Sequence, residues 1–171
     1  GRLTTGGLKL FAGGAPALIA SAAVDGDSVG RLVVDAALIA LAANLANLFD
    51  RAPGRTLKVG GLCFVVLAAV AGFDRDLAGV AVAMGALLAL ARADLGERLM
   101  IGDTGANPVG AVLALGLVLV VPFWGRVLAL AVVLGCNLLS EVVSFSSVID
   151  RVAPLRWVDR AGRPSGYPEL P

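Results

Sequence analysis

Six apolar stretches divide the chain, and the short segments between them carry almost all of its charge. The stretches run approximately from Leu8 to Val24, Leu32 to Phe49, Leu57 to Phe73, Leu77 to Ala91, Pro108 to Trp124, and Val127 to Ile149. Most are at the short end of the lengths that cross a hydrocarbon core of about 30 Å. Glycine and alanine recur inside them, as expected where helices pack closely in lipid. The pattern predicts an all-α, polytopic membrane bundle of about six transmembrane helices over residues 1–149, followed by a cytoplasmic C-terminal tail over residues 150–171.

The composition is that of a membrane protein. Of 171 residues, 58% are apolar and only 16% are charged, against about 25% in soluble domains, and the mean hydropathy is +0.88. The net charge of +1 leaves neither a basic surface nor an acidic tail, so we expect no nucleic-acid partner. Histidine is absent, which argues against zinc chemistry and serine–histidine triads because both depend on imidazole.

The distribution of Lys and Arg predicts which side of the membrane each connection faces. If the stretches alternate in direction, three basic residues fall on one side: Arg31, Arg75 and Arg126. Eleven fall on the other: Arg2, Lys9, Arg51, Arg55, Lys58, Arg92, Arg98, Arg151, Arg156, Arg160 and Arg163. Because positive charge is enriched on the inner side, we expect both termini in the cytoplasm. Trp124 lies at the end of one apolar stretch and Trp157 lies just past another, as interfacial anchors do.

Polar residues recur at every third position in NLANLFD, residues 44–50. Asn44, Asn47 and Asp50 therefore share one stripe of a helix, each about 60° from the one before. One interpretation is structural, with hydrogen bonds between helices followed by a helix-terminating Asp and a Pro-Gly turn. The other is a polar wall at the membrane surface, continued by three basic residues and suited to a phosphate-bearing ligand. These basic residues are Arg51, Arg55 and Lys58.

A second polar cluster, LMIGDTGANPVG at residues 99–110, separates two apolar runs. Its glycines let the backbone approach a ligand closely, and we expect Pro108 to begin the next helix with its N-terminal amides facing the loop. Asp103 is the single carboxylate there, and a carboxylate beside such amides suits a hard cation that holds phosphate oxygens. The structural alternative is an Asp/Thr helix cap with a glycine turn.

The last apolar stretch contains polar residues at intervals of three and four, which predicts a polar stripe on one helix. They are Asn137, Ser140, Glu141 and Ser144. An intramembrane glutamate is energetically costly, so we expect Glu141 to mark the bundle interior or a functional cavity. Asp35 lies nearer the outer end of its stretch, where it can reach the interface, and we interpret it as structural.

Four segments carry a resemblance to a known family. They are GRLTTGGLK (residues 1–9), NLANLFD (44–50), LMIGDTGAN (99–107) and SEVVSFSSVIDRVAPL (140–155). In order, spacing and expected sidedness they resemble the polyprenyl-phosphate sugar-1-phosphate transferases, glycosyltransferase family 4, which include phospho-N-acetylmuramoyl-pentapeptide transferase. NLANLFD is similar to the family's Asn-x-x-Asn-x-x-Asp element, and LMIGDTGAN is similar to its Phe-Met-Gly-Asp-x-Gly-Ser loop.

The resemblance implies a step of cell-envelope biogenesis at the cytoplasmic face of a bacterial inner membrane. A sugar-1-phosphate moves from a UDP-amino sugar to polyprenyl phosphate, and UMP is released. The resemblance implies that Asp103 binds Mg²⁺ and is catalytic together with Asp50, and that Asn44, Asn47 and Lys9 bind substrate. The implied partners are the UDP-amino sugar, the polyprenyl phosphate and the surrounding membrane lipids, and a homodimer is left open.

The chain also departs from the family's pattern. The family's paired aspartates lie upstream of its TTGGLK-like segment, so with Gly1 as the first residue we expect a fragment or processed chain without the N-terminal spans. RAPGRTLK replaces the family's Asp-Gly repeats, and Arg156, Trp157 and Val158 replace a histidine cluster. An alternative is therefore a catalytically degenerate membrane subunit or scaffold of the same fold. A small transporter is a third interpretation, against which the lack of an inverted repeat counts.

Overall fold

The computed structural model describes residues 5–25 and 28–164, with side chains described from residue 14 to 24 and from 28 onward. The described residues form helices and connections without a strand, which confirms the predicted all-α fold. The helices are α1 (Thr5–Asp25), α2 (Val29–Phe49), α3 (Arg55–Val70), η1 (Arg75–Leu77), α4 (Ala78–Ala89), α5 (Ala91–Leu95), α6 (Asp103–Val120), α7 (Phe123–Val142), α8 (Phe145–Arg151) and α9 (Ala153–Arg160).

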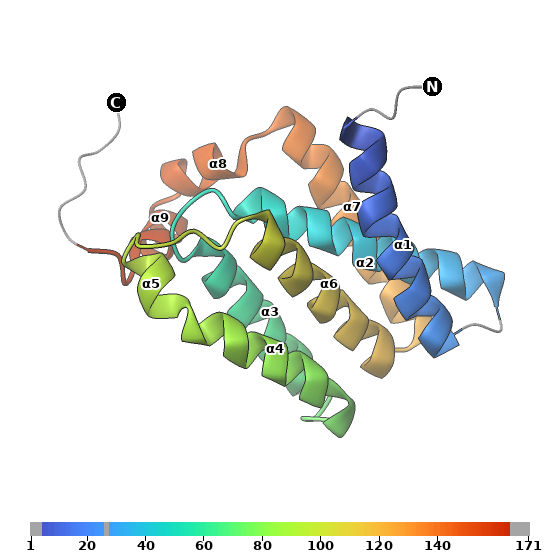
Figure 1. Ribbon diagram of the computed structural model, residues 1–171. Helices are drawn as coiled ribbons and strands as arrows, with labels where there is room; N and C mark the ends of the chain where they lie inside the picture. Colours follow the sequence, from blue (N-terminus) through green and yellow to red (C-terminus); the bar gives the residue numbers. More distant parts are fainter. Residues whose placement is uncertain (1–4, 26–27, 165–171) are drawn as a thin grey trace.

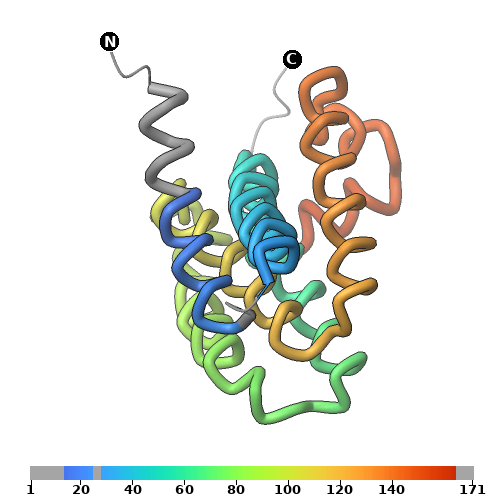
Figure 2. The backbone as a smooth tube through the Cα atoms, turned by 90° about the vertical axis from the view of Figure 1, so that its right-hand side faces the viewer, coloured from blue at the N-terminus to red at the C-terminus, as the bar shows by residue number. Residues whose placement is uncertain are grey.

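Helices α2 and α6 form the centre of the bundle (Figure 1). Helix α2 packs against α1, α6 and α7, and α6 also packs against α3 and α4. Figure 2 shows α2 between α1 on one side and α7 on the other. The two central helices approach closely at Gly110, where an added Cβ would collide with the backbone carbonyl of Ala42. A small residue at such a contact is what helix association in lipid favours.

The buried apolar side chains form two clusters that meet on α6. One cluster lies against α3 and α4 and includes Leu67, Met84 and Val109. The other lies against α1 and α2 and includes Leu38 and Val118. Because α6 contributes to both clusters, its position is fixed from both sides, and so is the loop that leads into it.

Four described segments are long and apolar enough to cross a membrane: Val29–Phe49, Arg75–Leu95, Asp103–Val120 and Phe123–Val142. Large apolar side chains are exposed on the outer faces of several helices. Examples are Ile19, Val70, Val82 and Leu128. Exposed apolar faces of this extent are compatible with contact to lipid tails. The membrane-embedded helical bundle therefore has structural support, whereas the number of six spans stays a prediction.

The structure corrects two predicted helix boundaries. The apolar stretch from Val127 to Ile149 is not one helix, because α7 ends at Val142 and Val143 and Ser144 have extended backbones. The Ser144 hydroxyl accepts a 3.4 Å hydrogen bond from the N–H of Ser147. Ser144 therefore caps the start of α8, as serine side chains do at helix starts, and does not continue α7. The predicted stripe from Asn137 to Ser144 is therefore not on a single helix.

Helix α6 starts earlier than expected. It begins at Asp103, and Pro108 lies inside it. Gly102 precedes it with a φ of 66°, and no side chain caps its first turn. The expectation that Pro108 begins the helix is wrong, and so is the alternative of an Asp/Thr cap, because a glycine occupies the cap position.

The connections gather at two opposite ends of the bundle (Figure 1). The connections α2–α3 and α5–α6, with α8 and α9, lie at one end, which we call the polar end, at the upper left of the view. The turns α1–α2, α3–α4 and α6–α7 lie at the other end. The bundle thus separates the two groups of connections as the Lys and Arg count requires, while the cytoplasmic location of the polar end stays a prediction.

Asp35 is fully buried near the other end, so the expectation that it reaches the interface is wrong. Its exposed fraction is 0%, and its Oδ2 accepts a 2.9 Å hydrogen bond from Nη1 of Arg126, which comes from the first turn of α7. The Nε of Arg126 donates to the carbonyl of Val121 at 2.8 Å. The pair ties α2 to α7, and its role is structural, because a buried charge needs a partner.

Candidate functional site

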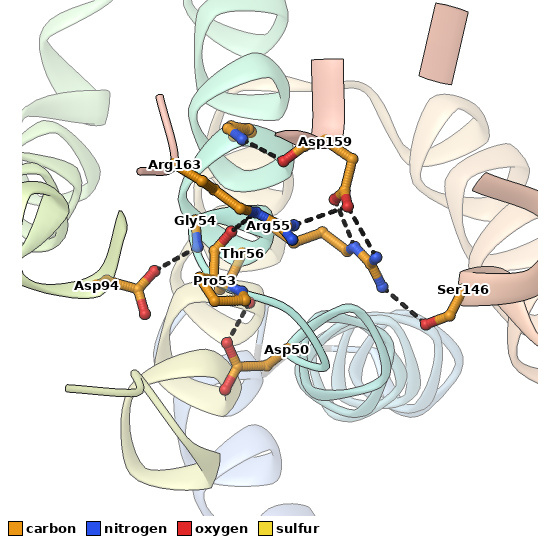
Figure 3. Close-up of polar contacts among 10 residues, drawn as sticks. Asp50, Pro53, Gly54, Arg55, Thr56, Asp94, Ser146, Asp159 and Arg163 are labelled. Atoms are coloured by element: carbon orange, nitrogen blue, oxygen red, sulfur yellow. Dashed lines mark hydrogen bonds and ion pairs between the residues drawn. The ribbon is translucent and has the colours of Figure 1, made fainter. Parts of the chain in front are cut away.

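Asp50 joins the two polar segments that the sequence singles out. It follows the last residue of α2, and only 8% of it is exposed. Its Oδ1 accepts a hydrogen bond from the Thr56 hydroxyl at 2.7 Å (Figure 3), and its Oδ2 accepts one from the backbone N–H of Gly102, also at 2.7 Å. Since Gly102 directly precedes α6, this carboxylate clamps the starts of α3 and α6 to the end of α2. NLANLFD and IGDTG therefore meet at the polar end.

A second carboxylate fixes the connection between α2 and α3. Asp94, a buried residue of α5, accepts a 2.8 Å hydrogen bond from the N–H of Gly54 (Figure 3). Gly54 has a φ of 71°, a conformation that favours glycine. A Cβ at Gly54 would also collide with the side chain of Leu95. The Pro-Gly turn is thus held in one conformation from two sides.

A buried ion-pair cluster centred on Asp159 attaches α9 to the same connection (Figure 3). The Nε and Nη2 of Arg55 donate to the two carboxylate oxygens of Asp159 at 2.7 and 3.1 Å, and Nη1 donates to the Ser146 hydroxyl at 2.8 Å. Arg163 donates to Asp159 at 2.7 Å, and the ammonium of Lys58 donates to the Asp159 backbone carbonyl at 2.6 Å. Three cations thus converge on one acidic residue.

The charge state of Asp159 follows from these contacts. Burial by itself raises the pKa of Asp159, but the hydrogen bonds and charge of Arg55, with the charges of Arg163 and Lys58, hold the pKa below its usual value of 3.8. Asp159 is therefore ionised at neutral pH. The predicted polar wall of three phosphate-binding cations is therefore wrong for Arg55, which is buried in the ion pair. It stays a prediction for Arg51 and Lys58.

Asp103 is differently placed from Asp50. It is exposed in the first turn of α6. Within the described part of the chain, no hydrogen bond or ion pair engages its carboxylate. Negative charge is favourable at a helix N-terminus, and both carboxylate oxygens of Asp103 are open to a ligand. The Asp50–Gly102 hydrogen bond places it one residue from the clamp.

Asn44 has the structural role that was one of its two interpretations. Its side-chain amide donates a 2.7 Å hydrogen bond to Oδ1 of Asn137 on α7. The amide of Asn137 donates to the carbonyls of Leu41 at 3.1 Å and Val133 at 2.8 Å. These bonds hold α2 against α7 through polar groups, as expected inside a membrane bundle. Asn44 is thus already partnered, and its binding of substrate stays a prediction.

Asn47 and Lys9 are the remaining residues that were predicted to bind substrate. Asn47 is half-buried two residues before the end of α2, and its backbone carbonyl accepts a 3.1 Å hydrogen bond from the N–H of Asp50. Its binding of substrate stays a prediction. Lys9 is in α1, but its side chain lies outside the described residues.

A polar cavity of about 260 Å³ opens beside the end of α2. It lies where α2 ends and the α7–α8 break begins. Its polar lining residues are Arg51, Ser140, Glu141, Ser144 and Ser146. A guanidinium with several hydroxyls suits phosphate oxygens, and a carboxylate suits a hydrogen-bond donor. Glu141 is exposed and lines this cavity, so the expected position in the bundle interior is wrong, and a function of the cavity stays a prediction. The break in α7 that creates this cavity leaves no signal in the apolar pattern.

A second cavity, of about 240 Å³, is almost wholly apolar. It lies among α2, α3, α6 and α7. Phe49 and Thr56 line it near the polar end, and Leu38 and Leu67 line it deeper in the bundle. Thr56 belongs to this cavity and also donates to Asp50. The apolar cavity and the Asp50 clamp therefore meet at the Thr56 side chain.

The described residues fit a magnesium ion only if a phosphate supplies some of its ligands. No group of three or more His, Cys, Asp or Glu in the described part of the chain is placed to share a metal. Mg²⁺ is typically bound by one or two carboxylates together with water and substrate phosphates. Asp103 fits that role, whereas Asp50 offers only the lone pairs that Thr56 and Gly102 leave unused.

The chain matches no protein-family model, no curated protein and no solved structure. The resemblance to the sugar-1-phosphate transferases therefore rests on the four sequence segments alone. To these segments the geometry adds the contact between NLANLFD and IGDTG, with one cavity of mixed lining and one almost wholly apolar cavity beside it.

Proposed function

We propose that this chain is part of an integral membrane transferase that moves a sugar-1-phosphate from a UDP-amino sugar to polyprenyl phosphate. The supporting observation is the 2.7 Å hydrogen bond from the Gly102 N–H to the Asp50 carboxylate. It joins the two segments whose resemblance implies this chemistry. If the two segments lay at opposite ends of the bundle, they could not bind the same substrate.

In this proposal a phosphate oxygen of the lipid attacks the β-phosphorus of the UDP-sugar. The bond to UMP breaks, UMP leaves with the electron pair, and a lipid-linked sugar diphosphate remains. A Mg²⁺ ion held by Asp103 would neutralise the diphosphate and stabilise the leaving group. Arg51 binds phosphate oxygens at the mouth of the polar cavity. Asp50 acts as a positioning residue, because both of its oxygens already hold the loops.

The apolar cavity supports a lipid as the second substrate. Its lining runs from Leu38 up to Thr56, so a chain lying there ends at the Asp50 clamp. A hydrocarbon chain lying in this cavity keeps apolar surroundings, and its phosphate then lies at the polar end. The polar end faces the cytoplasm of a bacterial inner membrane in this proposal, where UDP-sugars are made.

The direct test is release of UMP. The purified full-length protein in detergent, given UDP-N-acetylglucosamine, polyprenyl phosphate and Mg²⁺, is expected to release UMP, and release is expected to stop when Mg²⁺ is omitted. Asp103→Asn is expected to lower the rate by about 100-fold or more, the usual effect of losing one group that stabilises developing charge. Asp76→Asn is the matched control, because Asp76 is also exposed and belongs to η1, in the α3–α4 connection at the opposite end.

A degenerate scaffold is the second candidate, and one observation favours it. Arg55 and Lys58 are engaged with Asp159, and both Asp50 oxygens already accept hydrogen bonds. Much of the charge at the polar end thus holds the protein together. The scaffold hypothesis predicts no UMP release and no Mg²⁺-dependent binding of UDP-N-acetylglucosamine in calorimetry. Binding that depends on Mg²⁺ and is lost in Asp103→Asn would contradict it.

A further inference from the structure

The α8–α9 segment, residues 145–160, has an exposed apolar surface that the proposed transfer does not use. Five large apolar side chains on it are solvent-accessible: Val148, Val152, Leu155, Trp157 and Val158. Trp157 is 75% exposed, although indole is among the side chains that gain most from burial. A surface of this kind at the end of a membrane bundle calls for a covering partner.

The orientation of α9 is set by Asp159, whose carboxylate faces the protein and is bound by Arg55 and Arg163. Successive helical residues are about 100° apart, so Trp157 lies about 160° around α9 from Asp159. The face with Trp157 therefore points away from the bundle contact. The buried ion pairs fix which face of α9 contacts the bundle. The fold itself therefore keeps Trp157 exposed.

The charge around this face favours anionic lipid over a neutral or basic partner. Arg151 and Arg156 are exposed on the segment. Of its two acidic residues, Asp159 is neutralised by the buried ion pairs, which leaves Asp150 as the exposed one. An apolar face with a tryptophan and flanking arginines is the pattern of helices that lie in the membrane interface and attract anionic headgroups.

The position of the α8–α9 segment next to the candidate membrane spans makes the membrane its nearest partner. Helix α8 follows α7, a candidate membrane span, after two extended residues. Phe145 at the start of α8 stacks on Phe49 at the end of α2, with ring centroids 5.0 Å apart. The segment thus begins at the level where two spans end, which is the headgroup level of a bilayer.

We propose that α8 and α9 form an interfacial anchor, with Trp157 in the headgroup region and Arg151 and Arg156 bound to anionic phospholipid. The anchor is continuous with the Asp50 clamp, because Asp159 on α9 holds Arg55 at the start of α3. It does not depend on the proposed transfer reaction and is tested without any activity measurement.

The test uses Trp157 as its own probe. The chain has two tryptophans, so Trp124→Phe leaves Trp157 as the sole indole emitter. The variant is reconstituted into phosphatidylcholine vesicles, with and without phosphatidylglycerol, that contain lipids brominated near the headgroup. We expect quenching of Trp157 by the brominated lipid, stronger with phosphatidylglycerol, and loss of the difference at high salt.

Arginine variants identify the headgroup contact. Arg151→Gln with Arg156→Gln is expected to remove the extra quenching caused by phosphatidylglycerol. The matched control is Arg92→Gln with Arg98→Gln, an equal change of charge on exposed residues of the same end. The control is expected to keep the full effect of the anionic lipid. If both pairs behave alike, specific binding by α8 and α9 is wrong.

Two further results would overturn the anchor. One is a Trp157 emission like that of the urea-unfolded protein, quenched by aqueous acrylamide and not by brominated lipid. The other is quenching that is equal in both vesicles, which would show lipid contact without headgroup binding. Should Trp124→Phe fail to fold, Val158→Cys carrying an environment-sensitive dye, with Cys63 and Cys136 replaced by Ala, gives the same contrast.

Discussion

At the scale of single residues, Asp50 shows how one carboxylate can hold two loops. Each of its oxygens accepts one hydrogen bond, from the hydroxyl of Thr56 and from the N–H of Gly102. An amide of the same shape can keep both contacts, because its oxygen accepts from Gly102 and its nitrogen donates to Thr56. An alanine keeps neither and leaves a backbone donor without its partner.

This difference gives a prediction about stability. Asp50→Ala is expected to lower the free energy of unfolding by about 2 kcal/mol or more, whereas Asp50→Asn is expected to stay near the parent protein. Thr56→Val, which removes only one of the two bonds, is expected to fall between them. Unfolding in detergent, followed by circular dichroism, measures all three. Equal losses for Asn and Ala would mean that the charge, and not the hydrogen-bond geometry, holds the loops.

The residues also show which contacts a sequence can and cannot predict. The spacing of Asn47 and Asp50 predicts one shared stripe, and the structure has both at the end of α2. One interpretation of the sequence had Arg55 and Lys58 facing phosphate, but their partner is Asp159, which lies 104 residues beyond Arg55. Nothing local to Arg55 indicates a carboxylate from another helix. Pairings over such distances arise from packing and leave no trace in periodicity.

At the scale of elements, the apolar pattern locates helices better than it locates their ends. The stretch from Val127 to Ile149 reads as one apolar run, yet serine capping at Ser144 divides it. The start of α6 at Asp103 depends on the backbone of Gly102, and glycine permits both a turn and a cap. Single hydrogen bonds decide where a helix ends, and a pattern of apolar residues does not show them. The polar cavity arises at one such helix end.

Helix α9 gives a prediction about pH. The pKa of Asp159 is lowered in the folded state, so its ion pairs stabilise the attachment of α9 at pH values above its unfolded pKa. This contribution is expected to fade as the pH drops below 3.8, through the still lower folded pKa. Amide hydrogen exchange over residues 153–160 measures the release of α9. It is expected to accelerate in acid while α2 and α6 stay protected.

Two variants separate this effect from general acid unfolding. Asp159→Asn is expected to show fast exchange in α9 already at neutral pH, with little further change in acid. Asp150→Asn, at an exposed acidic residue of α8, is expected to keep the profile of the parent protein. If both variants follow the parent, α9 is held by its apolar contacts and not by the ion pairs.

At the scale of the whole molecule, the polar contacts gather toward the two opposite ends of the bundle. The polar end holds the Asp50 clamp, the Asp159 cluster and the polar cavity, whereas the pair of Asp35 and Arg126 lies toward the other end. The all-α class was predictable because apolar composition and length leave few other folds in lipid. That the two polar segments lie at the same end was predictable from the Lys and Arg count. Their direct contact was not, since periodicity does not say which helices are neighbours.

The side of the membrane that the polar end faces is the last prediction, and the proposed transfer depends on it. In a background with Cys63 and Cys136 replaced by Ala, single cysteines are placed by Asp76→Cys at the turn before α4 and by Ser147→Cys on α8, both exposed positions. In intact spheroplasts a membrane-impermeant maleimide is expected to label the first and to label the second only after permeabilisation, because the sequence pattern assigns eleven of the fourteen basic residues to the polar side. The opposite pattern would leave the fold intact but place Asp103 outside, where no UDP-sugar reaches it, and the transferase proposal would then be wrong.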